Sequence, residues 1–183
     1  MTKVGIVYFS GTGTTRRLAS YVEQGVINTE AICHLLEIEG ADITEGRWQN
    51  EEVAVALDSC EAIIFGSPTY MGSVSGQMKC FLDAMVSRWV SQKWNGKIAA
   101  GFTASSLSAG DKLNCLFDLT TFAMQMGMVW VGPGVTFAGG MNPNGFYLGV
   151  GAVASTPEQL QQIDIDTATH LGQRVAELTG RLT

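Results

Sequence analysis

The feature that most restricts the fold of this chain is a regular alternation of short apolar runs with longer segments of helical periodicity. The apolar runs are rich in Val, Ile and Phe, as strands buried on both faces are. Five strands alternating with five helices predict an α/β fold with a five-stranded parallel sheet, because parallel strands need crossover connections. We expect strands at residues 3–9, 31–38, 61–66, 97–104 and 128–137, and helices at residues 14–26, 51–57, 75–90, 111–126 and 156–178.

Length and composition limit the kind of protein this is. A chain of 183 residues suits one domain, which we expect to span residues 1–183. The share of hydrophobic residues, 46%, predicts a packed interior. The net charge of −6 argues against nucleic acid as a partner, since few Lys and Arg remain to neutralise phosphates. No run reaches the roughly 18 apolar residues of a membrane span and no basic leader precedes the first strand, so we expect a cytoplasmic protein.

The cysteines do not suggest a metal site or a disulfide. They are Cys33, Cys60, Cys80 and Cys115. No two of them form a CxxC pair, and only two histidines accompany them, whereas a zinc site needs a cluster of such ligands. We therefore expect no metal, and free thiols in a reducing compartment.

The segment directly after the first expected strand is suited to binding a phosphate. It consists of Ser10, Gly11, Thr12, Gly13, Thr14 and Thr15, and we call it the first loop. Ligands of doubly wound sheets lie beyond the carboxyl ends of the strands, where this loop falls. Its glycines allow a tight turn with inward N–H groups, the following helix adds partial positive charge, and its hydroxyls are donors. The first loop is thus expected to hold a terminal phosphate.

Other phosphate-handling loops each lack a residue that their chemistry needs. A P-loop ends in Gly-Lys-Ser/Thr, and the first loop has no Lys. A dinucleotide-binding GxGxxG segment needs a third glycine, and Arg16 stands in that place. No Cys nucleophile lies near, and no phospho-acceptor Asp follows the third strand. A mononucleotide phosphate and a plain polar turn remain, and the position after the first strand favours the phosphate.

Two motifs resemble known flavoproteins. Ser-x-Thr-Gly-x-Thr after the first strand resembles the FMN-phosphate signature of flavodoxins. Residues 66–83 are similar to a segment of WrbA-type NAD(P)H:quinone oxidoreductases, which are flavodoxin-like FMN enzymes. Trp89, Gly96-Lys97 and Gly127-Met128-Val129 fall at spacings that also fit that family. The resemblance covers most of the chain and implies a flavodoxin-like three-layer sandwich with FMN as its cofactor.

The resemblance also implies which residues surround the flavin. A second loop, Pro68, Thr69, Tyr70, Met71 and Gly72, would line the ring. Tyr70 can stack on a flavin, and the Pro and Gly fix an irregular backbone whose N–H groups can face it. A third loop is implied at residues 103–108, where the expected cofactor contacts are Thr103, Ala104, Ser105 and Ser108.

The chain departs from the family in ways that bear on its electron acceptor. Its third loop is poorer in glycine and contains Leu107. Met126 stands where the family has a histidine near the nicotinamide or quinone, so a donor that orients the quinone is lost. Trp89 corresponds to a family tryptophan that approaches the flavin of a neighbouring subunit, and packing on its own helix is the alternative.

Two functions from different classes remain open, and a third alternative is a family member that binds FMN weakly or serves a regulatory role. One is an NAD(P)H-dependent oxidoreductase that passes electrons through FMN to a quinone or similar small acceptor, which residues 66–83 favour. The other is an electron-carrier flavodoxin that shuttles single electrons between protein partners, which the first loop and Met126 favour. The cofactor carries the chemistry in both, so no catalytic side chain is expected. Apolar residues of the region from Trp89 to Trp94 and of the glycine-rich segment 138–154 would otherwise face water, which predicts a homodimer or tetramer.

Overall fold

The central element of the fold is a parallel sheet, seen in the computed structural model, which describes residues 1–182. Its main strands are β1 (Lys3–Tyr8), β2 (Ile32–Glu37), β5 (Ala62–Tyr70), β7 (Ile98–Ser105), β8 (Val129–Trp130) and β9 (Val150–Val153). The strand order is β2-β1-β5-β7, and β8 and β9 both pair with the free edge of β7. All of these pairs are parallel, which confirms the predicted α/β class.

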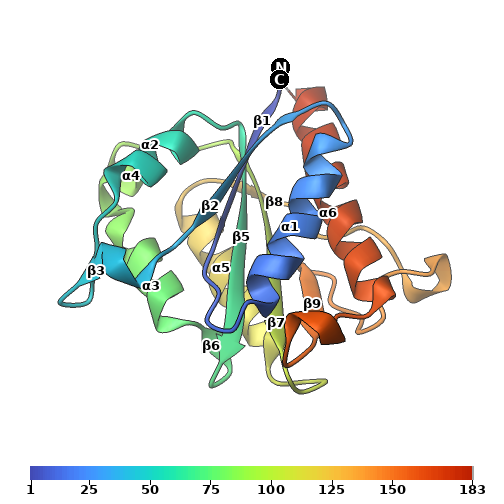
Figure 1. Ribbon diagram of the computed structural model, residues 1–183. Coiled ribbons are helices and arrows are strands. Elements are labelled where there is room, and N and C mark those ends of the chain that lie inside the picture. Colours follow the sequence, from blue (N-terminus) through green and yellow to red (C-terminus); the bar gives the residue numbers. More distant parts are fainter. Residues whose placement is uncertain (183) are drawn as a thin grey trace.

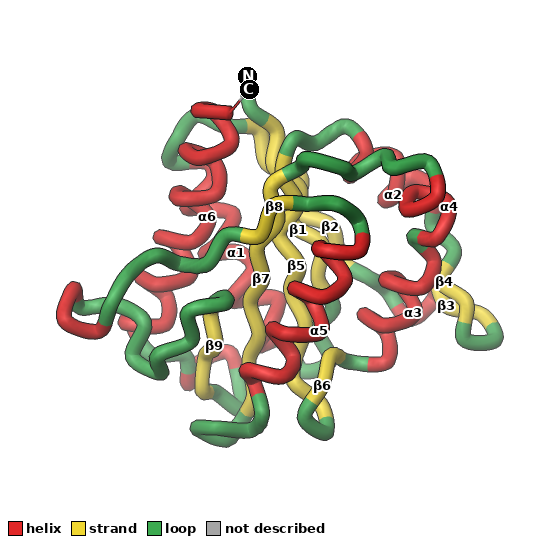
Figure 2. The backbone as a smooth tube through the Cα atoms, turned by 180° about the vertical axis from the view of Figure 1, so that it is seen from behind, coloured by secondary structure: helices red, strands yellow, loops and turns green. Residues whose placement is uncertain are grey.

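The fifth strand differs from its prediction because it is split in two. Instead of one strand at residues 128–137, β8 pairs with the start of β7 and β9 pairs with its end, from Phe102 to Ser105. Gly132-Pro133-Gly134 follows β8, and a proline has no N–H to donate to a strand ladder. The chain between the two pieces runs outside the sheet as a long loop (Figure 2). Residues 138–154, which we expected to be loop alone, therefore contain the last strand.

Helices cover both faces of the sheet and complete the predicted three-layer sandwich (Figure 1). One face carries α1 (Thr14–Ile27) and α6 (Gln162–Leu182), and the other carries α2 (Glu51–Asp58), α3 (Gly76–Ala84), α4 (Val86–Val90) and α5 (Lys112–Gln125). The expected helix 75–90 is divided at Met85 into α3 and α4. The expected helix 156–178 begins as a 3₁₀ turn, η3 (Pro157–Gln159), and continues as α6.

Short elements complete the chain. They are η1 (Gly40–Asp42), the antiparallel pair β3 (Ile43–Thr44) and β4 (Arg47–Trp48), β6 (Ser73–Val74), which folds back on the end of β5, and η2 (Phe137–Gly139) in the long loop.

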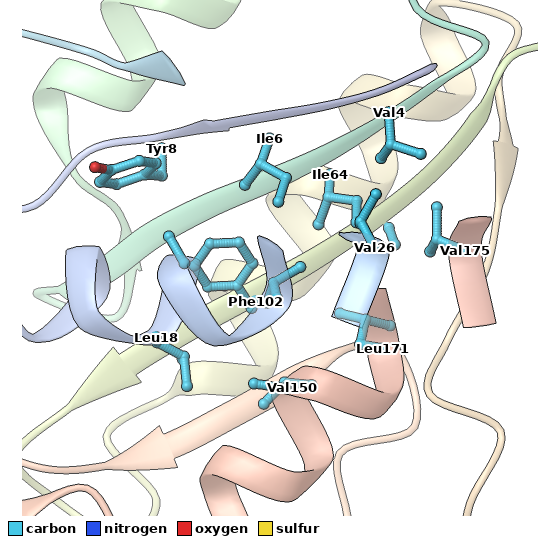
Figure 3. Packing of buried hydrophobic residues seen from close by; sticks show 14 of the residues in the cluster. Val4, Ile6, Tyr8, Leu18, Val26, Ile64, Phe102, Val150, Leu171 and Val175 are labelled. Atoms are coloured by element: carbon cyan, nitrogen blue, oxygen red, sulfur yellow. The ribbon is translucent and has the colours of Figure 1, made fainter. Parts of the chain in front are cut away.

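Two apolar cores fill the space between the sheet and the helix layers. On one side, Ile6, Ile64 and Phe102 of the sheet pack against α1 and α6 (Figure 3). On the other side, the rings of Phe65, Trp94 and Phe122 contact one another, with centroids 5.6, 6.3 and 6.4 Å apart. Burial of this apolar surface is the main force that holds the layers together.

The fold places the three expected cofactor loops at one edge of the sheet. Because β1, β5 and β7 are parallel and in register, their carboxyl ends lie side by side, at the lower edge in Figure 1. The first loop follows β1, the second loop forms the end of β5 and its turn into β6, and the third loop follows from the end of β7. This is the edge at which doubly wound α/β sheets bind their ligands.

Candidate functional site

The first loop is held in shape by its own serine. Ser10 Oγ accepts hydrogen bonds from the backbone N–H groups of Gly13 and Arg16, both at 3.1 Å. Gly13 caps α1 with a φ of 91°, a left-handed conformation that glycine adopts without strain. The first turn of α1 contains no acidic residue, so the positive end of the helix dipole is open to an anion.

The hydroxyl of Thr14 is the clearest sign of a ligand in this loop. Thr14 Oγ1 is buried and has no hydrogen-bond partner. A buried hydroxyl without a partner is costly, and native proteins seldom keep one unless a ligand or water satisfies it. Thr15 beside it is also buried, whereas Gly11 and Thr12 are exposed at the rim of the loop. These features fit a phosphate bound mainly by neutral donors.

A cation next to the first loop is already engaged. The Arg16 guanidinium donates to both carboxylate oxygens of Glu37, at 2.9 and 2.7 Å, and Tyr8 donates to the same carboxylate at 3.0 Å. Burial and the negative charge of Glu37 raise the pKa of Tyr8 to about 12. Arg16 therefore stands as half of a neutral pair at the end of β2 rather than as a free positive charge.

The second loop reaches over the first. Met71 and Gly72 both have left-handed backbones, with φ of 50° and 81°, as the two central residues of a type I′ turn do. Met71 is fully exposed, and Tyr70 is 43% exposed. A Cβ on Gly11 would lie 2.2 Å from the hydroxyl oxygen of Tyr70, so the two loops are in direct contact and a larger residue there would displace the tyrosine side chain. The strained, exposed turn is of the kind found at ligand sites.

Two polar side chains of α5 fix the second loop, and sequence reasoning missed both. Asn114 Nδ2 donates to the carbonyl of Gly72 at 2.8 Å. One turn further along α5, Asp118 Oδ2 accepts from Ser73 Oγ at 2.5 Å and from the N–H of Val74 at 3.3 Å. The spacing of four residues, which puts both side chains on one helix face, is the only sequence signal that could have suggested them.

The expected residues at the strand ends lie beneath the loops. Pro68, Thr69, Thr103 and Ala104 are buried. The hydroxyls of Thr69 and Thr103 are 2.7 Å apart and share a hydrogen bond that joins β5 to β7. Ser105 is half-buried and Ser108 is exposed. The structure thus brings every predicted site residue to the same edge of the sheet. Some, such as Thr12 and Ser108, are exposed there, and others, such as Thr69 and Thr103, are buried beneath the loops.

The third loop is tied down from below by a lysine that the sequence did not single out. Lys112, the first residue of α5, is fully buried. Its Nζ donates to Ser105 Oγ at 2.9 Å and to the carbonyl oxygen of Leu107. Burial lowers the pKa of Lys112, and the nearby Asp164 carboxylate opposes that shift.

Two further positions that bear on the family resemblance, Met126 and Trp89, lie outside the three loops. Met126 is buried, with 2% of its surface exposed, and Trp89 on α4 is 48% exposed. Both line a groove of about 740 Å³ between α3, α4 and α5, together with Val86, Leu82 and Phe122. The groove begins beside Ser73 and Val74, so it borders the second loop.

The described residues include the side-chain types that a metal site or a disulfide requires. Within residues 1–182, no group of three or more His, Cys, Asp or Glu side chains could hold a metal ion. The cysteines are free, and burial raises the pKa of Cys33 to about 12. Across the same residues, no helix is long and apolar enough to span a bilayer.

Comparisons with known proteins agree with this geometry. A family model described as NADPH-dependent FMN reductase matches residues 3–142. The chain is 34% identical to Flavodoxin FldP of Pseudomonas aeruginosa over 193 residues, covering 100% of this chain and 99% of that protein. It is 36% identical to an NAD(P)H dehydrogenase (quinone) of Geobacter sulfurreducens over 148 residues, covering 73% of each.

A solved structure is similar over the whole chain. It is the crystal structure of a flavodoxin, WrbA-like protein from Agrobacterium tumefaciens, with a TM-score of 0.81, 37% identity and complete coverage of both chains. The resemblance expected from the sequence is therefore confirmed. The fold, the three loops at one sheet edge and these matches lead to one conclusion: the chain belongs to the NADPH-dependent FMN reductase family, among its flavodoxin-like, WrbA-type proteins.

Proposed function

We propose that this chain, as one domain of residues 1–183, binds FMN and passes electrons from NAD(P)H to a quinone or a similar small acceptor. The observation that carries the proposal is the buried, unpaired hydroxyl of Thr14 in a loop that meets two others at one sheet edge. The names of the family and of the Geobacter relative support the nicotinamide and the quinone. When bound, FMN supplies the redox chemistry, accepting a hydride from the nicotinamide and passing two electrons on.

The first loop would hold the phosphate of FMN. Ser10 shapes the loop by accepting two backbone N–H groups, which leaves the hydroxyls of Thr12, Thr14 and Thr15 as candidate donors to phosphate oxygens. The positive end of α1 would favour the negative charge of the phosphate. A charge-assisted hydrogen bond from Thr14 would satisfy the one hydroxyl of the loop that is buried without a partner.

The second and third loops would hold the flavin ring between them. Tyr70, Met71 and Gly72 would line one side, and Ser105 and Ser108 the other. Thr69 and Thr103 would act indirectly, since their shared hydrogen bond fixes the strand ends from which both loops start. Backbone N–H groups of the irregular second loop would favour the negative charge that the ring gains on reduction.

No side chain is assigned a catalytic role in this proposal. The residues of the three loops bind, orient and shield the ring from water, which is the part of flavin chemistry that a protein supplies. Met126 is buried and offers no hydrogen-bond donor to a quinone, so the proposed acceptor is a quinone or a similar small molecule that needs no donor at this position.

An electron-carrier flavodoxin is the second candidate function. The relative that supports it is Flavodoxin FldP, which is 34% identical over the full length of this chain. The two candidates share the FMN site and differ in whether a nicotinamide reduces the flavin directly. The enzyme is favoured because the family model that matches most of the chain is that of a reductase.

We propose that the protein forms a homodimer or a tetramer through the groove beside the second loop. Val86 and Trp89, which line the groove on its α4 side, are 60% and 48% exposed. Apolar side chains gathered in this way on one face are typical of an interface. Trp94, which we also expected at this surface, is instead fully buried in the core.

The proposal is tested by following NADH or NADPH oxidation by the FMN-loaded protein with benzoquinone as the acceptor. Activity is expected, and it should disappear with FMN binding in Gly13→Val, because a side chain there is strained at a φ of 91° and would crowd Pro157 at 3.3 Å. Gly46→Val is the matched control, since Gly46 also has a positive φ, of 74°, but faces open space in the β3–β4 turn. FMN-loaded protein that oxidises neither nicotinamide would overturn the enzyme reading.

A further inference from the structure

Lys112 is placed where an ordinary surface lysine would not be. Its side chain is fully buried at the start of α5, directly beneath the third loop. The ammonium donates to Ser105 Oγ at 2.9 Å and to the Leu107 carbonyl, and it lies 6.0 Å from the centre of the Phe146 ring. Both hydrogen-bond acceptors belong to the third loop, so this one side chain joins the loop to the helix that follows it.

The local sequence around Lys112 breaks several rules of stability at once. A cation in the first turn of a helix opposes the helix dipole. The residue before it, Asp111, caps α5 with a left-handed φ of 55° and makes no side-chain cap. Lysine is also among the residues least often fully buried. Departures of this kind tend to gather at functional sites, where the protein keeps a locally unfavourable arrangement for another purpose.

The charge of Lys112 has one close ionisable counterpart, Asp164. Asp164 lies in the first turn of α6 and is only 3% exposed. It interacts electrostatically with Lys112, and burial raises the pKa of its carboxyl group. The two hydrogen bonds given above go from the ammonium to the third loop. The Asp164 carboxylate interacts with the backbone of Val153 on β9, the residue paired with Ser105, so both charges lie close to this loop and oppose each other there.

We propose that Lys112 is a positioning residue that holds the third loop in place and sets a buried positive charge against it, and thereby favours the reduced form of bound FMN. The proposal deepens the function given above and rests on it, since it takes the third loop as part of the FMN site. Lys112 touches Ser105, a predicted cofactor contact, and needs no contact of its own with the flavin.

The direction of the effect follows from charge. Two electrons and one proton added to oxidised FMN leave the ring with one more negative charge, which a nearby cation stabilises. At an effective dielectric constant of about 20, a unit charge roughly 10 Å away changes such an equilibrium by about tenfold. For a two-electron couple, tenfold corresponds to about 30 mV in the midpoint potential.

The test is the midpoint potential of FMN bound to three variants, measured by anaerobic dithionite titration against a reference dye. Lys112→Met removes the charge and keeps the length of the side chain, and it should lower the potential by about 30 mV, the tenfold change given above. Asp164→Asn removes the opposing charge, keeps an acceptor oxygen, and should raise the potential. If Lys112 and Asp164 had purely structural roles, the two variants would not shift the midpoint potential in opposite directions.

Lys97→Met is the matched control. Lys97 also uses its ammonium to hold backbone carbonyls, those of Leu57, Asp58 and Cys60, and burial also lowers its pKa. It lies at the opposite end of β7 from the third loop. Lys97→Met should lower the melting temperature and leave the potential of bound FMN unchanged.

A second readout needs no cofactor. In the FMN-free protein, Lys112→Met should speed hydrogen exchange at the amides of residues 105–111, and Lys97→Met should not. An unchanged potential in Lys112→Met would overturn the proposal. A potential that falls or stays unchanged in Asp164→Asn would also overturn it. If Lys112→Met does not fold, the Asp164→Asn result decides the matter alone. If the wild-type protein binds no FMN, the proposed function fails instead, and the exchange experiment still tests the anchoring of the loop.

Discussion

At the scale of single residues, the site combines hydroxyls that are ready for a ligand with glycines that let the loops meet. The hydroxyl of Thr14 is buried and unpaired, whereas Ser10 uses its oxygen to shape the loop. Gly11 leaves room for Tyr70 in its present position, because a Cβ there would lie 2.2 Å from the tyrosine hydroxyl and displace it. The first loop is therefore arranged for an anion before one binds, which lowers the cost of ordering on binding.

The Thr14 hydroxyl gives a prediction in which stability and binding move in opposite directions. Thr14→Val removes the unpaired Oγ1 and keeps the shape of the side chain, so the free protein should be about 1 kcal/mol more stable or unchanged. The same variant should bind FMN roughly 10- to 100-fold more weakly, the loss of a hydrogen bond to a charged group. Thermal melting and FMN titration measure the two effects. Ser20→Ala, on α1 outside the loop, is the control, and equal FMN affinity in Thr14→Val would remove Thr14 from the site.

The sequence alone could identify the loops but not their supports. Residues 10–15 stand out because glycines, hydroxyls and a helix start are neighbours in the chain. Asp118 and Ser73 are 45 residues apart, and no local pattern says that they meet. Nothing in the local sequence marks Lys112 as buried, since the residue whose ring it approaches, Phe146, belongs to the long loop far along the chain.

At the scale of elements, the two helices on one face are held together by close contact of their backbones. A Cβ on Gly25 of α1 would lie 1.9 Å from the Thr169 carbonyl oxygen, and one on Gly172 of α6 would lie 2.0 Å from that of Val22. Small residues at a helix crossing let the axes approach, and α1 and α6 lie side by side in Figure 1. Because α1 carries the first loop at its N-terminus, this contact also positions the phosphate site.

The helix crossing predicts that a normally stabilising change destabilises here. Gly→Ala in a helix gains roughly 0.5–1 kcal/mol, but Gly172→Ala must push α1 and α6 apart and should lose about 1–3 kcal/mol. Gly180→Ala in the same helix is the control, because its Cβ would only touch Thr2 at 3.4 Å. Urea unfolding of both variants measures the difference. Gly172→Ala as stable as Gly180→Ala would show that the crossing can relax.

The alternation of strands and helices was predictable because each element has its own period in the sequence. The fifth strand was not, since its two halves, β8 and β9, are each defined by pairing with β7 and are separated by a long excursion. The pattern of apolar residues cannot show that a two-residue strand and a second strand about twenty residues later pair with the same neighbouring strand. The division of the expected helix 75–90 at Met85 likewise depends on tertiary packing, since Met85 is buried in the core shared with Phe65.

At the scale of the whole molecule, the three loops and the largest described groove lie next to each other. The three loops occupy one edge of the sheet, and the groove of about 740 Å³ beside the second loop is lined by apolar side chains such as Leu82, Trp89 and Phe122 together with polar ones such as Lys79 and Asp83. A second subunit seated in this groove would stand next to the flavin site, which would link assembly to cofactor binding.

The assembly is tested by placing a charge in the groove. Trp89→Glu should shift a dimer or tetramer toward monomers, because loss of a central tryptophan commonly costs about 2 kcal/mol or more, roughly 30-fold in the dissociation constant. Val55→Glu is the control, since Val55 is similarly exposed, at 54%, but lies on α2 outside the groove. Light scattering during size exclusion gives the masses, and a wild-type protein that is monomeric at micromolar concentration would rule the assembly out.

The central claim is that a nicotinamide reduces FMN directly on this chain. The most direct measurement is anaerobic stopped-flow mixing of the FMN-loaded protein with NADH and, separately, with NADPH, followed by the flavin absorbance. We predict that at least one nicotinamide bleaches the flavin in a single step whose rate rises with nicotinamide concentration. Flavin that stays oxidised with both, and is reduced only when a partner reductase is added, would contradict the claim and identify the protein as an electron carrier.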